Sequence, residues 1–269
     1  MQRLKKTDYL LTYMIIITFA SFVCGFFLGA SVIKGKIYAE QSVQSDRKAQ
    51  GMYPDKDFIA YYYNVYKPMQ EFKAEYLRMN SQQEADTSSQ QLRKLVKKTL
   101  QEVEKAGVPE TSPLLLQAKH EYIQSLKAYT EDAGNSEFDT AWLRAEADMY
   151  KAVATWEQLY VTKKSASLEV PKSISFSQWK EYPFHYRNYI SAEYLYQTKK
   201  LVEYRPVDLT AKLDSVIAND QAASLGWTDV PFAIRVLMTT DAVRSGDFSA
   251  LRKQVYPKVA FPEMPLFTE

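Results

Sequence analysis

Few side chains in this sequence are spaced for chemistry. The two histidines, His120 and His185, lie on separate expected helices, and neither has a second histidine three or four residues away to complete a metal site. No Gly-rich phosphate loop, Gly-x-Ser-x-Gly elbow or His-Glu-x-x-His pair occurs. Residues 241–247 resemble a calcium loop but lack its intervening acidic residues. The sequence therefore predicts a protein that is not an enzyme and holds neither cofactor nor metal.

The residues that stand out are aromatic, and they gather in an expected helix over residues 175–204. We select Trp179, Tyr182, Tyr186 and Tyr189 as candidates for binding a partner, because Tyr182, Tyr186 and Tyr189 share one helical stripe. The alternative is that this helix is central and buried on several sides, so that the rings are core.

The composition favours an all-α protein. The chain has 269 residues, only eight glycines and little alternation of apolar and polar residues, which argues against a sheet. A net charge of +2 gives no reason to expect a nucleic-acid partner. The single cysteine, Cys24, excludes a disulfide framework, and no Asn-x-Ser/Thr sequon occurs, which suits an exported bacterial domain.

Residues 10–33 form an uncharged apolar run of about 24 residues, long enough to cross a bilayer as a helix. A cleaved signal peptide usually has a shorter apolar core, and Val23 stands where a lipoprotein signal ending at Cys24 would place a small residue. We therefore predict an uncleaved signal-anchor, with the bilayer as one partner. The basic residues before it favour a cytoplasmic N-terminal tail, residues 1–9, and export of the bulk of the chain.

Within this segment Ser21, Gly25 and Gly29 recur every four residues and share one face. Small residues at this spacing allow two transmembrane helices to approach closely, so self-association as a homodimer is one hypothesis. The alternative is that glycine is simply common in such helices.

Beyond the anchor, residues 34–56 read as a polar stalk and residues 57–162 as an antiparallel four-helix bundle. The first helix of the bundle carries an apolar stripe with heptad spacing, made of Phe58, Tyr62, Val65, Met69, Phe72, Tyr76 and Met79. The stripe continues in phase through Pro68, which predicts one kinked helix. Further helices are expected over residues 87–106 and 113–133, and a fourth begins at Ser136 or Asp139 and runs to about residue 159. The short loops between them imply antiparallel neighbours.

A polar linker, residues 163–172, leads to a second, small helical domain, residues 173–269. Its helices are expected over residues 175–204, 207–219, 229–241 and 247–256. The Pro-rich tail, residues 257–269, is expected to lie in a groove of its own domain rather than to act as a free recognition peptide.

This organisation predicts a single-pass protein of the cell membrane, with a non-catalytic, extracytoplasmic helical part that acts as a scaffold or adaptor. Its partner would be another protein or a polymer of the cell envelope. The alternatives are an extracytoplasmic ligand-sensing helical bundle, by analogy of fold, and an envelope hydrolase or its regulator.

Overall fold

A computed structural model of the chain describes residues 51–81, 85–131 and 136–268. These residues form helices joined by turns and loops and contain no strand, so the predicted all-α class is confirmed. The predicted cytoplasmic tail (1–9), signal-anchor (10–33) and most of the stalk (34–56) lie outside the described residues, as do Ser21, Gly25 and Gly29. Within the described ranges, no helix combines the length and the apolar character needed to cross a bilayer.

The first helical stretch is continuous through Pro68, as its apolar stripe predicted. It consists of α2 (Asp55–Tyr61), the π-helical turn η1 (Tyr62–Tyr66) and α3 (Lys67–Ser81). In η1 the Lys67 N–H donates to the Tyr62 carbonyl, five residues back. This wider turn comes directly before Pro68, where the ring would otherwise meet a carbonyl of the preceding α-helical turn. Every member of the predicted stripe except Tyr62 is buried.

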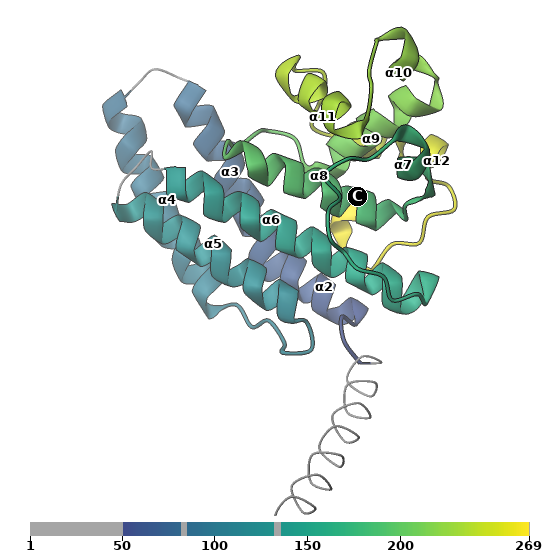
Figure 1. The fold of residues 1–269 in the computed structure, drawn as a ribbon. Coiled ribbons are helices and arrows are strands. Elements are labelled where there is room, and N and C mark those ends of the chain that lie inside the picture. The colour runs from purple at the N-terminus through teal and green to yellow at the C-terminus, as the bar shows by residue number, and fades with distance from the viewer. Residues whose placement is uncertain (1–50, 82–84, 132–135, 269) are drawn as a thin grey trace, which may run out of the picture. The chain divides into compact units, whose positions relative to one another are not determined.

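The next three helices each pack on the one before. They are α4 (Ala85–Lys105), α5 (Pro113–Glu131) and α6 (Ser136–Trp156), and α6 continues into a second π-helical turn, η2 (Glu157–Thr162). Figure 1 shows α6 running between α5 and α8. Because α6 is covered on more than one side, charged residues such as Glu146 and Asp148 are buried together with its alanines.

The C-terminal half is made of shorter helices. They are α7 (Phe176–Glu181), α8 (Phe184–Thr198), α9 (Pro206–Ala218), α10 (Gln221–Ser224), α11 (Val230–Thr239) and α12 (Asp247–Val255). The prediction of a single helix over residues 175–204 is wrong, because the helix is interrupted at Pro183. Tyr182 has an extended backbone (ψ 140°), as expected for a residue whose α conformation would clash with a following proline.

Residues Met52–Glu269 form one compact unit. The contact between α6 and α8 joins the predicted bundle, residues 57–162, to the predicted C-terminal domain, residues 173–269. The predicted linker, residues 163–172, contains no helix. The division into two domains at this segment stays a prediction.

The end of the tail packs into the same compact unit, and its predicted position in a groove of a separate C-terminal domain stays a prediction. Met264, Leu266 and Phe267 are buried, and the last two belong to the short 3-10 turn η3 (Pro265–Phe267). The Phe267 ring packs against the ring of His185, with 5.1 Å between the centroids. The tail therefore completes the core beside α8.

Candidate functional site

The structure separates the four aromatic candidates into two pairs. Trp179 is fully buried, and its Nε1 donates a hydrogen bond to Asp214 Oδ1 at 2.6 Å. Tyr189 is also buried. Tyr182 and Tyr186 are half-buried and lie together, with 5.1 Å between their ring centroids in an edge-to-face arrangement.

The break at Pro183 positions this second pair. Ser175 caps α7 through a reciprocal capping box with Gln178, and α7 ends before Tyr182. Pro183 then stands at the N-cap of α8. Tyr182 therefore lies outside both helices, beside the first turn of α8, which carries Tyr186.

Tyr182 and Tyr186 line an open hollow of about 1110 Å³, which we call the Tyr182 groove. Its walls come from η2, from the segment after η2, and from the junction of α7 and α8. The lining residues are Glu157, Gln158, Thr162, Lys164, Ala166, Ser167, Glu169, Val170, Pro171, Lys172, Glu181, Tyr182, Pro183 and Tyr186.

A buried carboxyl group forms one wall of the groove. Glu157, at the start of η2, is only 5% exposed. Its Oε2 accepts hydrogen bonds from the backbone N–H groups of His185 (3.1 Å) and Tyr186 (3.3 Å). These N–H groups have no partner within α8, so Glu157 caps this helix from another part of the chain.

Burial raises the pKa of Glu157 to about 7, although the two backbone hydrogen bonds oppose the shift. A carboxyl group of this pKa is the kind that enzymes use as a general acid or base. The described residues, however, give Glu157 no hydroxyl, thiol or imidazole partner, so no nucleophile and base are paired here. Its position is explained by the capping of α8.

The segment after η2 forms the opposite wall. The Tyr186 hydroxyl donates to the Glu169 carbonyl at 2.6 Å, and Gln158 Nε2 donates to the Ala166 carbonyl at 3.0 Å. None of the backbone N–H groups of residues 165–173 donates to another described residue. This wall therefore leaves backbone donors unused among the described residues.

Neither histidine belongs to a group of possible metal ligands in the part of the chain that the structure describes. His120 lies on the surface and contacts Gln124. His185 is fully buried with one ring nitrogen 2.9 Å from the Ala260 carbonyl oxygen, and burial lowers its pKa to about 4. The sequence analysis selected Tyr182 and Tyr186 but missed Glu157 and the wall formed within residues 164–172.

Comparison of the chain with protein-family models, with curated proteins and with solved structures finds no match. The functional argument therefore depends on the geometry of the site alone.

Proposed function

We propose that this protein is a non-catalytic scaffold or adaptor, anchored in the cell membrane by residues 10–33, that holds an extended segment of a partner protein of the cell envelope in the Tyr182 groove. One observation carries the proposal. Two half-buried tyrosine rings line the same open hollow as a segment whose backbone N–H groups have no partner among the described residues.

The lining favours a peptide over a compact small molecule. An extended chain can pair its carbonyl groups with unused N–H groups of residues 165–173, as strands do when they add to an exposed edge. The rings of Tyr182 and Tyr186, next to Pro183, offer flat apolar surface of the kind that is enriched in the centre of protein interfaces.

The charges around the groove are mixed. Lys164 and Lys172 stand on the same rim as Glu169 and Glu181, and all four are exposed. A rim with both positive and negative charges suits a polar partner segment and sets its direction through charge pairing. Such a rim has no excess of positive charge to attract a nucleic acid.

A cross-linking experiment tests the groove. A photoreactive residue at Ser167 should capture a protein of the envelope, whereas the same residue at the exposed Asn64, outside the groove, should not. A synthetic peptide covering the cross-linked segment should then bind the purified full chain.

The matched variants are Tyr182→Ala and Tyr63→Ala, since Tyr63 is an exposed aromatic residue (51% exposed) that does not line the groove. Loss of a central ring contact should weaken peptide binding about tenfold or more in Tyr182→Ala. Equal binding by the two variants, or equal capture from Ser167 and Asn64, would refute the groove as the docking site.

The anchoring is tested separately. Protease added to cells stripped of their wall should digest residues 52–269 while the membrane is intact. If those residues survive until the membrane is broken, the bulk of the chain faces the cytoplasm and the partner must be sought there.

A further inference from the structure

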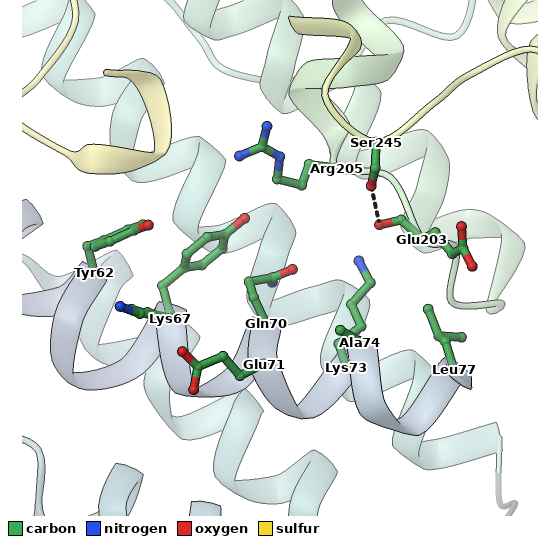
Figure 2. A pocket seen from close by; sticks show the side chains of 11 residues that line it. Tyr62, Lys67, Gln70, Glu71, Lys73, Ala74, Leu77, Glu203, Arg205 and Ser245 are labelled. Carbon is green, nitrogen blue, oxygen red and sulfur yellow. Dashed lines mark hydrogen bonds between the residues drawn. The ribbon is translucent and has the colours of Figure 1, made fainter. Parts of the chain in front are cut away.

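A second cavity, of about 460 Å³, lies between α3 and the segment that precedes α9. Figure 2 shows the Lys73 side chain pointing from α3 toward the opposite wall, which carries Arg205, and both residues line the cavity. The lining residues are Tyr62, Tyr66, Lys67, Gln70, Glu71, Lys73, Ala74, Leu77, Glu203, Arg205 and Ser245. We call it the Lys73 pocket, and it shares no residue with the Tyr182 groove.

The floor of the pocket holds a buried charge pair. Lys73 Nζ lies 3.4 Å from Glu146 Oε1, and both side chains are almost fully buried. The same oxygen also accepts a hydrogen bond from Gln70 Nε2 at 3.0 Å. Lys73 carries three N–H donors, so this single contact leaves donors on the pocket side.

Arg205 is fixed on the opposite wall. Its backbone N–H and its Nε both donate to Asp208 Oδ2, at 3.0 and 3.3 Å, at the start of α9. The side chain is 24% exposed, and these contacts do not use its two terminal nitrogens. A guanidinium held in this way presents a planar pair of donors, the geometry that matches a carboxylate or a phosphate.

The third group is Tyr66, at the end of η1. Its side chain is 2% exposed, and its hydroxyl has no hydrogen-bond partner among the described residues. Burial raises its pKa well above the usual value, so the phenol keeps its proton and stays a donor. A buried polar atom without a partner is rare in folded proteins and calls for an explanation.

We propose that the Lys73 pocket binds a small molecule through a carboxylate or phosphate group. Lys73, Arg205 and Tyr66 bring unused donors to one cavity, and an anionic group supplies the acceptors that they lack. The volume lies in the range of small-molecule sites.

The acidic residues of the lining do not supply acceptors to Lys73, Arg205 and Tyr66. Glu71 and Glu203 are both exposed. In Figure 2 the Glu203 carboxylate points away from Arg205, while the Glu203 backbone carbonyl accepts the hydrogen bond from the Ser245 hydroxyl. The competing occupant is water, which fills polar cavities of this size without selectivity for charge.

Titration calorimetry on the full chain in detergent separates these occupants. The probes are inorganic phosphate and succinate, with glycerol as an uncharged control, at constant ionic strength set with sodium chloride. We expect phosphate or succinate to bind with millimolar or tighter affinity and glycerol not to bind. The ratio of the phosphate and succinate affinities shows which anion the donors fit.

The test variant is Tyr66→Phe, and its matched control is Tyr61→Phe. The Tyr61 hydroxyl is also buried and unpartnered among the described residues, but Tyr61 does not line the pocket. Neither substitution breaks a hydrogen bond, so both variants should fold.

Loss of a hydrogen bond to a charged group should weaken anion binding about tenfold in Tyr66→Phe and leave it unchanged in Tyr61→Phe. Failure of both anions to bind, or equal affinity in the two variants, would overturn the proposal. Neither result would bear on the proposal that the Tyr182 groove binds a partner segment.

Discussion

Replacing Glu157 with glutamine should make the protein more stable at high pH and leave it nearly unchanged at low pH. In the folded chain burial raises the pKa of Glu157 from 4.5 to about 7. Between these two values the folded state binds more protons than the unfolded state, so the stability that Glu157 contributes is full below about pH 4.5 and is lost as the pH rises toward 7.

The shift from 4.5 to about 7 corresponds to about 3 kcal/mol, since one pKa unit is worth about 1.4 kcal/mol. Because the side chain is only 5% exposed, solvent screening reduces this figure little. A glutamine oxygen still accepts the hydrogen bonds that cap α8 but carries no charge to desolvate. For a unit of this size, about 3 kcal/mol corresponds to a rise of roughly 6–12 °C in melting temperature.

The assay is urea unfolding of the wild type and of Glu157→Gln from pH 4.5 to pH 8. Burial also shifts the pKa of Asp148 up to about 6 and that of His185 down to about 4, but both groups are shared and cancel in the difference. The exposed Glu181 supplies the control Glu181→Gln, measured over the same pH range. If the Glu157→Gln difference did not grow with pH beyond that of Glu181→Gln, the inferred burial and pKa of Glu157 would be refuted.

Three further substitutions test the packing. Lys73→Met should lower the free energy of unfolding by about 3–5 kcal/mol in urea melts, because it leaves the Glu146 carboxylate buried without its charge partner. The double variant Lys73→Met/Glu146→Met should recover most of the lost stability, and no recovery would contradict the pairing. Trp179→Phe should cost about 1–3 kcal/mol, since it removes a buried donor to Asp214, and an unchanged melting temperature would count against that bond. Ser175→Ala should cost about 1 kcal/mol in thermal melts through loss of the α7 cap, whereas no loss would show that the cap contributes little.

Elements with a strong apolar period could be predicted from the sequence. The stripe that begins at Phe58 fixed the first helix and its buried face, and it showed that the helix continues through Pro68. The π-helical form of η1 could not be foreseen, because nothing in its sequence marks the extra residue in the turn. The helix break at Pro183 could have been predicted from the proline itself, but the prediction of one helix over residues 175–204 ignored it.

The candidate sites depend on tertiary contacts and were predicted only in part. Tyr182 and Tyr186 stood out as aromatic residues at helical spacing, but sequence does not say which rings of such a set are core. Glu157 reads as one more charge on a helix, and its burial follows from the docking of α8 on the end of α6. Lys73 and Arg205 are far apart in the sequence, so their common pocket is visible only in the folded chain.

The buried tail also sets an order of events during synthesis. The rings of Phe184 and Phe248 lie against Phe261, and Phe267 closes over His185. A nascent chain that has emerged only as far as α12 therefore exposes these aromatic surfaces, even though every helix from α2 to α12 has been made. Cooperative closure of the unit has to wait for η3, and until then the chain stays open to chaperones that bind exposed apolar segments.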